Sequence, residues 1–173
     1  PANIAFVKAQ LMDAIGKLEK FTGHKLDWDR LREVMRISNE TAMWWKKATD
    51  LARAKPSPLS GFDMFNYMAT IVCVRGKQEG ADLFRRWKDG EEEKYRILWD
   101  GIACWPYLAP TYKILKKNGI NVVTSTYPES WTLLYELNDL ADMAKAYDAI
   151  YVQRNVEYAT DRLLNRARDF QVD

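Results

Sequence analysis

The chain has 173 residues, of which 47% are hydrophobic and 29% charged, and its formal net charge is +2. This composition is typical of a folded globular protein and excludes wholesale disorder. Because the net charge is small and both signs are interspersed, neither nucleic acid nor a membrane surface is expected as a partner. No apolar run approaches the ~18 residues that span a bilayer. Cys73 and Cys104 are too few for a disulfide framework, so we expect a protein of the reducing cytoplasm.

Two long helices are predicted at the start of the chain. The first runs from residue 4 to 21 and should bury one apolar face, formed by Ile4, Val7, Leu11, Ile15 and Leu18. Gly23 ends it, because glycine tolerates the left-handed cap. The second begins after the N-cap Asp27 and ends before Pro56. Its predicted inward residues are Leu31, Val34, Ser38, Trp45 and Leu51.

A third helix follows the stiff Pro56-Ser57-Pro58 connector. Ser60 and Asp63 have the spacing of a capping box, which predicts a helix start. The segment 62–74 is apolar almost all round, so we expect a buried central helix with Cys73 as a core residue. A shorter polar helix is predicted up to about Lys88.

The pattern changes to strand and helix after residue 91. Residues 95–99 and 120–125 are predicted strands, joined by a helix that runs from Pro106 to Lys117. Strand, helix and strand with short connections form a βαβ unit, so the strands should be parallel, with a right-handed crossover. Tyr127-Pro128 is a predicted loop. Two further helices are expected near 138–149 and 155–170, and Val172 is the predicted first residue of a third strand.

The expected fold is therefore mixed α and α/β. A helical region over residues 1–90 is followed, over residues 91–173, by part of a doubly wound parallel α/β (flavodoxin-like) domain that opens with the βαβ unit. A two-stranded sheet is marginally stable by itself. The chain also starts at Pro1 without a methionine and stops soon after a helical stretch. We therefore expect either that more chain exists or that this piece packs against a partner, and the two ends favour an incomplete chain.

Residues 93–106, which read EKYRILWDGIACWP, resemble the strand and following loop in the second α/β domain of one enzyme family. This family comprises the subunits of 2-hydroxyacyl-CoA dehydratases (2-hydroxyglutaryl-CoA dehydratase D-component) and of benzoyl-CoA reductases. Further segments also match in order and spacing: 18–23 with 26–27, 56–58, 74–76, 122–131 and 144–147. The resemblance covers essentially the whole chain, and it depends on this order rather than on one motif.

The resemblance implies a cytoplasmic enzyme of anaerobic metabolism. Two related subunits form a heterodimer with 4Fe-4S clusters, and a separate ATP-hydrolysing iron–sulfur activator supplies an electron. The electron serves either to remove water from a 2-hydroxyacyl-CoA or to reduce an aromatic acyl-CoA, and the residues do not separate these reactions. The family's cluster-binding cysteines lie outside this stretch, so the chain alone should bind no cluster and be inactive. The family also has a longer connector between Trp87 and Glu91.

The candidate substrate-binding residues follow the two predicted strands. Parallel α/β sheets bind ligands beyond the carboxyl ends of their strands. The loops at that edge carry Gly101, Cys104, Trp105, Tyr107, Ser125, Tyr127 and Trp131. These aromatic residues could shield a radical or an aromatic ring from water, or could simply cover the edge of the sheet. We expect Cys104, Trp105 and Tyr127 near the acyl thioester or the cluster, and His24 with the first helix far away.

Other residue types offer little chemistry, and no catalytic residue is assigned. Two cysteines cannot replace the three or four thiolates of a cluster, and His24, the only histidine, has no nucleophilic triad around it. The sequence contains no phosphate-binding GxxxxGK[ST] motif. Three lysines could meet CoA phosphates, or could form the solvated face of their helix: Lys113, Lys116 and Lys117. The alternative function is a non-catalytic helical interaction module.

Overall fold

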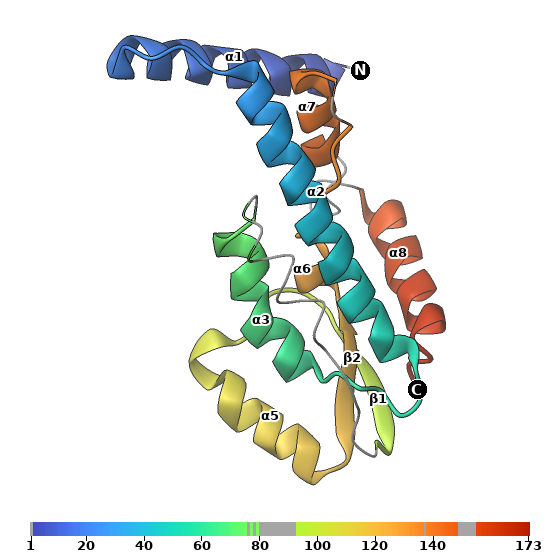
Figure 1. The fold of residues 1–173 in the computed structure, drawn as a ribbon. Helices are drawn as coiled ribbons and strands as arrows, with labels where there is room; N and C mark the ends of the chain where they lie inside the picture. The colour runs from blue at the N-terminus through green and yellow to red at the C-terminus, as the bar shows by residue number, and fades with distance from the viewer. Residues whose placement is uncertain (1, 76, 78, 80–92, 137, 149–154) are drawn as a thin grey trace.

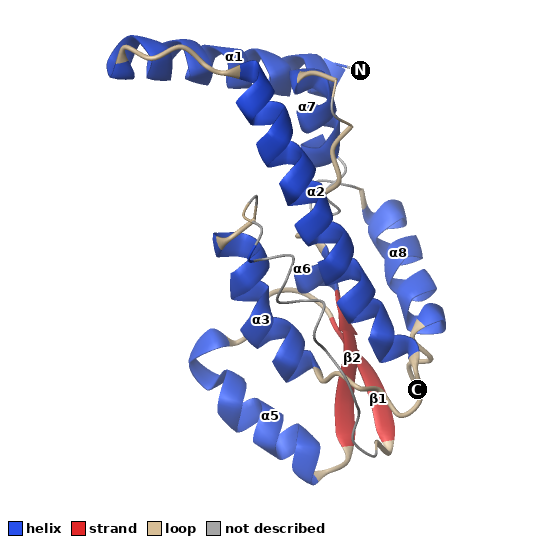
Figure 2. Cartoon of the chain, viewed as in Figure 1, coloured by secondary structure: helices blue, strands red, loops and turns tan. Residues whose placement is uncertain are grey.

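The computed structural model describes residues 2–75, 77, 79, 93–136, 138–148 and 155–173. Helices and strands follow in the order α1 (Ala2–Thr22), α2 (Trp28–Asp50), the 3-10 helix η1 (Leu51–Arg53), α3 (Gly61–Cys73), β1 (Tyr95–Trp99), the 3-10 helix η2 (Trp105–Tyr107), α5 (Leu108–Lys117), β2 (Ile120–Ser125), α6 (Thr126–Glu129), α7 (Leu140–Asp148) and α8 (Val156–Asp169). The two strands lie at one end of the molecule, and α1 with α7 lies at the other (Figures 1 and 2). Within the described ranges, no helix is long and apolar enough to cross a membrane. The predicted polar helix up to Lys88 and the connector 87–91 lie outside the described residues.

Helix α1 packs against α7 near its N-terminal end. The predicted face is half-buried at Ile4, Val7, Leu11 and Ile15. Leu18 is 60% exposed, so its predicted burial is wrong. Leu18 lies in the last turns of a 21-residue helix, whereas α7 has only nine residues, so the shorter partner cannot cover the whole length. Helix α1 thus extends beyond its partner (Figure 1).

Helix α2 begins as predicted, and Ser38 and Trp45 of its predicted inward face are buried. The Asp27 side chain accepts a hydrogen bond of 2.9 Å from the backbone N–H of Arg30, which satisfies one of the free donors at the helix start. Trp45 is fully buried, at 0% exposure. Leu51, predicted to face inward, is exposed because the chain has passed from α2 into η1 by this residue.

Helix α3 begins with the predicted capping box. The Ser60 hydroxyl accepts from Asp63 N, and the Asp63 carboxylate accepts from Ser60 N at 3.0 Å. The helix is not buried all round as expected, because the described chain covers only one side of it. The buried side chains are Met64, Phe65, Met68 and Ile71, whereas Tyr67, Val72 and Cys73 are exposed. The assignment of Cys73 to the core was therefore wrong.

Strands β1 and β2 pair in parallel, which confirms the predicted βαβ unit. The regular part of the intervening helix starts at Leu108 rather than at Pro106, because the residues around the proline form η2. Gly119 has a φ of +70°, the left-handed conformation that glycine tolerates at a helix end. Helices α3 and α5 both contact β2 and each other. Gly61 of α3 lies directly against Val122 of β2.

One hydrophobic core joins the helices to the sheet. It is formed by Ala42, Trp45, Ala48, Ala52, Leu59, Met64, Met68, Ile71, Val123 and Phe170. These residues come from α2, η1, the connector before α3, α3 itself, β2 and the end of α8. The helical half of the sequence and the βαβ half therefore bury apolar surface against each other.

Arg96 of β1 is the only arginine among the largest fully buried side chains of the described residues. Its guanidinium donates to the carbonyl oxygens of Ala52 at 2.8 Å and Phe170 at 2.9 Å. It also forms an ion pair with the buried carboxylate of Glu93. Arg96 thereby connects β1 to η1 and to the end of α8.

The chain after β2 is more helical than predicted. Tyr127-Pro128 was expected to be a loop but lies in the one-turn helix α6. Helices α7 and α8 lie close to their predicted ranges, and Asn155 caps α8 by accepting from Tyr158 N at 3.0 Å. Beyond α8, the backbone N–H of Asp173 donates to the carbonyl oxygen of Arg96 at 3.0 Å. The chain therefore returns to the free edge of β1.

Candidate functional site

The loops that follow β1 and β2 leave the sheet at the same edge. Trp99 and Ser125, the last residues of the two strands, are partners in the parallel register. The Thr126 hydroxyl then joins the loops, since it donates to Asp100 Oδ1 at 2.7 Å and accepts from Gly101 N at 3.0 Å. Gly101 has a φ of +83°, which other residues rarely adopt. Hydrogen bonds of Thr126 therefore connect the loop after β1 to the loop after β2 at the carboxyl edge.

Five aromatic side chains form a continuous group at this edge, which we name the edge aromatic cluster: Trp99, Phe65, Trp105, Tyr127 and Trp131. Phe65 packs edge-on against Trp99 and Trp105, with ring centroids 6.0 Å apart in both pairs. Trp105 and Tyr127 are 6.4 Å apart, and Tyr127 and Trp131 are 6.3 Å apart. All four pairs have the edge-to-face geometry that aromatic rings favour.

The structure brings together three of the residues predicted from the sequence and adds two that were missed. Trp105, Tyr127 and Trp131 were predicted. Trp99 could have been found, because it is the last residue of the first predicted strand. Phe65 carries no such signal, since it lies in a helix 40 residues before Trp105 and meets it only through tertiary packing.

The remaining predicted residues lie apart from the ring contacts. Tyr107 is 68% exposed, and no ring contact joins it to the cluster within the part of the chain that the structure describes. Cys104 is half-buried, with its Sγ 3.5 Å from the hydroxyl of Thr111. Ser125 is 2% exposed. Gly101 contributes its backbone N–H to the link between the loops.

Two buried polar atoms at this edge have no hydrogen-bond partner among the described residues: Ser125 Oγ and Trp131 Nε1. The large majority of buried polar groups in proteins are hydrogen-bonded, so each unsatisfied one needs an explanation. Thr124, which precedes Ser125, bonds to Arg166 of α8. Ser125 is paired with Trp99, whose ring contacts Phe65. Ser125 ends β2 and Trp131 belongs to the edge aromatic cluster, so both unsatisfied atoms belong to residues of the carboxyl edge.

The described residues do not fit an iron–sulfur cluster. Cys73 is exposed at the end of α3, and Cys104 lies against Thr111. Within the described ranges, no group of three or more His, Cys, Asp and Glu side chains could hold a metal ion. Cluster ligation needs three or four converging thiolates, which two separate cysteines cannot supply.

His24 lies far from the edge aromatic cluster. It is exposed just after α1, at the end of the molecule opposite the strands. Its hydrogen bond in this turn is made by the backbone N–H, which donates to the Thr22 hydroxyl. The position agrees with the expectation that the first helix and this histidine lie away from the carboxyl edge.

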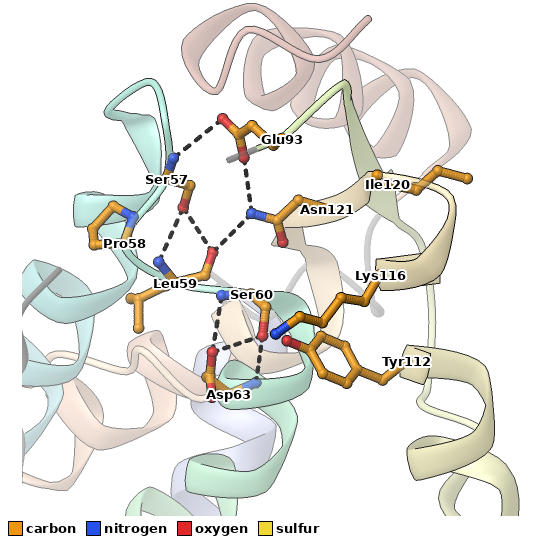
Figure 3. Close-up of a pocket in the computed structure, with 11 residues that line it drawn as sticks. Ser57, Pro58, Leu59, Ser60, Asp63, Glu93, Tyr112, Lys116, Ile120 and Asn121 are labelled. Carbon is orange, nitrogen blue, oxygen red and sulfur yellow. Dashed lines mark hydrogen bonds between the residues drawn. The ribbon is translucent and has the colours of Figure 1, made fainter. Parts of the chain in front are cut away.

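A cavity of about 200 Å³ lies away from the edge aromatic cluster, at the amino end of β2 (Figure 3). Its polar side chains bond to one another or to the backbone of residues 57–60. The Glu93 carboxylate accepts from Ser57 N at 3.1 Å and from Asn121 Nδ2 at 2.8 Å. Lys116, one of the three lysines considered for CoA phosphates, lies 5.9 Å from the centre of the Tyr112 ring. All three lysines are exposed. These internal bonds join the 57–60 turn to the sheet.

Comparison with known proteins supports one family. The chain matches the family described as "2-hydroxyglutaryl-CoA dehydratase, D-component" over residues 1–173. It is 42% identical to the (R)-2-hydroxyisocaproyl-CoA dehydratase alpha subunit of Clostridioides difficile, covering 94% of this chain and 44% of that protein. It is also 42% identical to the (R)-phenyllactyl-CoA dehydratase alpha subunit of Clostridium sporogenes, covering 94% and 43%.

A more distant similarity exists to a benzoyl-CoA reductase subunit of Thauera aromatica, with 27% identity over 97% of this chain and 45% of that protein. The chain spans less than half the length of each of these three relatives. The family resemblance inferred from the residues is confirmed, and the chain belongs to the 2-hydroxyglutaryl-CoA dehydratase D-component family.

Proposed function

We propose that this chain is part of a subunit of a 2-hydroxyacyl-CoA dehydratase, which removes water from an (R)-2-hydroxyacyl-CoA. The difference in similarity supports dehydration over ring reduction. Two dehydratase alpha subunits are 42% identical to this chain, whereas the benzoyl-CoA reductase subunit is 27% identical. Because one fold can host several reactions, this preference depends on the relatives and not on the architecture.

The observation that carries the proposal for the site is the edge aromatic cluster with unsatisfied polar atoms beside it. The rings of Trp105, Tyr127 and Trp131 can exclude water from a reacting acyl group. Ser125 Oγ and Trp131 Nε1 are buried at this edge and bond to no described residue, so each keeps its capacity to donate a hydrogen bond. We place the acyl part of the substrate at this edge.

The electron-transfer parts of the enzyme are proposed to lie outside the described residues. These are a 4Fe-4S cluster held by cysteines of the longer protein, a related second subunit in a heterodimer, and an ATP-hydrolysing iron–sulfur activator, all in the cytoplasm. The cluster would supply the single-electron chemistry that side chains cannot perform. The alpha-subunit names of the relatives support association with another subunit.

We further propose that β1 and β2 belong to a doubly wound flavodoxin-like domain in which a third parallel strand adjoins β1. The hydrogen bond from Asp173 N to the Arg96 carbonyl oxygen supports this arrangement. The resulting strand order would be 2-1-3, which is that of flavodoxin-like sheets. The carboxyl edge that carries the edge aromatic cluster would then lie at the usual ligand-binding position of such a sheet.

The test is an anaerobic assay of the full-length subunit with its partner subunit, activator, ATP and a low-potential electron donor such as dithionite. Substrates are aliphatic and aromatic (R)-2-hydroxyacyl-CoA thioesters and benzoyl-CoA, and the acyl-CoA products are identified by mass spectrometry. We expect ATP-dependent formation of the 2-enoyl-CoA and no change in benzoyl-CoA. Reduction of benzoyl-CoA alone would assign the protein to the reductases. Failure with every substrate, in a complex that carries its cluster, would favour the non-catalytic interaction module.

A further inference from the structure

The segment 131–136, which connects α6 to α7, has no regular secondary structure, yet four of its six residues are half-buried. Backbone carbonyl groups removed from water need hydrogen-bond donors. In a strand these donors come from a neighbouring strand. Here they come from the side chains of two helical regions that precede the segment by more than 50 residues.

Arg75, two residues after the end of α3, supplies donors for two of these carbonyls. Its Nη1 donates to the Trp131 carbonyl oxygen at 2.5 Å, and its Nη2 donates to the Leu133 carbonyl oxygen. Its Nε donates to the hydroxyl of Ser38 on α2 at 2.5 Å. The guanidinium carbon lies 5.4 Å from the centre of the Tyr135 ring, within the range of a cation–π contact.

Asn39 of α2 satisfies the other end of the segment. Its Nδ2 donates to the Tyr135 carbonyl oxygen at 2.7 Å, and its Oδ1 accepts from Tyr135 N at 2.8 Å. This paired bonding reproduces what an adjacent strand would offer. Arg75 and Asn39 together therefore fix the backbone from residue 131 to residue 135.

The contacts of Arg75 require the shape of the guanidinium more than its charge. Among the residues that the structure describes, its hydrogen-bond acceptors are two carbonyl oxygens and a hydroxyl, and none is a carboxylate. Burial lowers the pKa of Arg75 from its ordinary value, but an arginine remains charged. A planar fork with several fixed N–H groups can reach three acceptors at once, whereas the single ammonium of lysine has no such fixed geometry.

We propose that Arg75 is a positioning residue that fixes Trp131 in the edge aromatic cluster. The residue whose carbonyl group Arg75 holds is the same one whose ring packs 6.3 Å from Tyr127. On the α6 side, Trp131 N donates to the Pro128 carbonyl oxygen at 3.3 Å and Thr132 N donates to the Glu129 carbonyl oxygen at 2.8 Å, whereas Arg75 holds the Trp131 carbonyl group from the opposite side. Loss of the Arg75 bonds releases the ring and opens the cluster to water. The consequence for turnover rests on the proposed function.

The first test measures hydrogen–deuterium exchange in the full-length protein with its partner subunit, for Arg75→Lys and for a matched control, Arg53→Lys. Arg53 also contacts an aromatic ring, at 5.0 Å from the centre of Phe170, and it pairs with Asp50 and Asp169. In Arg75→Lys we expect exchange in peptides covering 131–136 to rise about tenfold, the factor expected when one or two hydrogen bonds are lost. Arg53→Lys should leave these peptides unchanged. Unchanged exchange in Arg75→Lys, with the protein folded, overturns the proposal.

The second test is a double-mutant cycle on kcat with Trp131→Phe. If Arg75 acts through Trp131, Arg75→Lys lowers kcat about tenfold in the parent and has little further effect in Trp131→Phe. A general loss of folding would lower the rate equally in both backgrounds, and such additive effects overturn the proposal. Activity is referred to the folded fraction of each variant. An inactive parent complex overturns the proposed function instead, and exchange alone then decides whether Arg75 fixes the segment.

Discussion

The indole N–H of Trp45 donates a hydrogen bond of 3.1 Å to the carbonyl oxygen of Pro128, 83 residues further along the chain. This bond crosses the core from α2 to α6, so the helical region supports the backbone that leads into the candidate site. Trp45 is fully buried and packs in the main hydrophobic cluster. Packing and hydrogen bonding at Trp45 can be separated by substitution.

Trp45→Ala should lower the free energy of unfolding by about 3–5 kcal/mol, because it removes a large buried side chain and leaves a cavity. Trp45→Phe should cost about 1–3 kcal/mol, since the Pro128 carbonyl loses the indole donor while most packing remains. The exposed neighbour Met43→Ala should change stability by less than about 0.5 kcal/mol. Urea denaturation of the full-length protein measures all three. Equal stabilities of Trp45→Ala and Met43→Ala would contradict the burial.

Gly61→Ala should destabilise the protein by about 1–3 kcal/mol through overpacking. A Cβ at this position would lie 2.5 Å from Val122 Cγ1, and nearer still to Val122 Cβ, so α3 would have to move away from β2. Gly16→Ala is the matched control, because nothing lies within 4 Å of its added Cβ in α1. It should stabilise by about 0.5–1 kcal/mol, since alanine favours helix more than glycine. Opposite shifts in melting temperature are expected, and shifts of the same sign would argue against the close contact.

Arg96→Met should cost about 3–5 kcal/mol, because it leaves the Glu93 carboxylate buried without its charge partner. The double variant Arg96→Met with Glu93→Gln should recover part of this loss, since no uncompensated charge remains. Arg36→Met removes an exposed partner of Glu33 and should change stability far less than Arg96→Met, because exposed ion pairs are screened by solvent. Chemical denaturation of the four proteins gives the comparison. A double variant less stable than Arg96→Met would show that the buried charge is not the cause.

Asp142 should make the free energy of unfolding depend on pH in the acidic range. The hydrogen bond from Lys145, with further bonds from Asn138 N and Asp139 N, lowers the pKa of Asp142 from 3.8 to about 2. A carboxylate with a depressed pKa stabilises the fold above the pKa of the unfolded chain, and this contribution disappears as the pH falls through the folded value. The stability difference between the parent and Asp142→Asn should therefore be constant above about pH 5 and shrink between about pH 4 and 2. Asp161→Asn, an exposed change on α8, is the control. A difference independent of pH would refute this role for the charge.

Trp105→Ala should reduce turnover more than stability. Trp105 is 43% exposed but joins Phe65 to Tyr127 in the edge aromatic cluster. We expect a loss of about 10- to 100-fold in kcat, typical of a substrate held in the wrong position. Tyr107→Ala, in the same turn and more exposed, should be close to the parent in both measurements.

The core control for Trp105→Ala is Ile71→Ala, which should cost about 2–5 kcal/mol while the folded fraction stays active. Leu18 is unsuitable for this purpose because it is exposed. Activity per folded molecule and melting temperature are compared for the three variants. If Trp105→Ala melts as early as Ile71→Ala and the folded fraction turns over normally, Trp105 serves only packing.

The sequence by itself determined the features that depend on neighbouring residues. The N-cap at Asp27, the capping box at Ser60 and the glycine helix end at Gly23 each involve residues no more than a few positions apart, and all were predicted correctly. The two strands and their parallel pairing also followed from the pattern, because a short helical crossover leaves little other choice. The order of short motifs was also sufficient to indicate the family.

Tertiary structure decided which side of each element is covered. Cys73 and Leu18 have the residue type and spacing of core positions but are exposed, because no described element lies over that part of α3 or α1. Phe65 joined the candidate site, and Arg75 reached the 131–136 segment, through contacts between residues 40 or more positions apart. The periodicity of a sequence indicates which face of a helix or strand is apolar. Burial depends on whether another element packs on that face, which only the assembled chain determines.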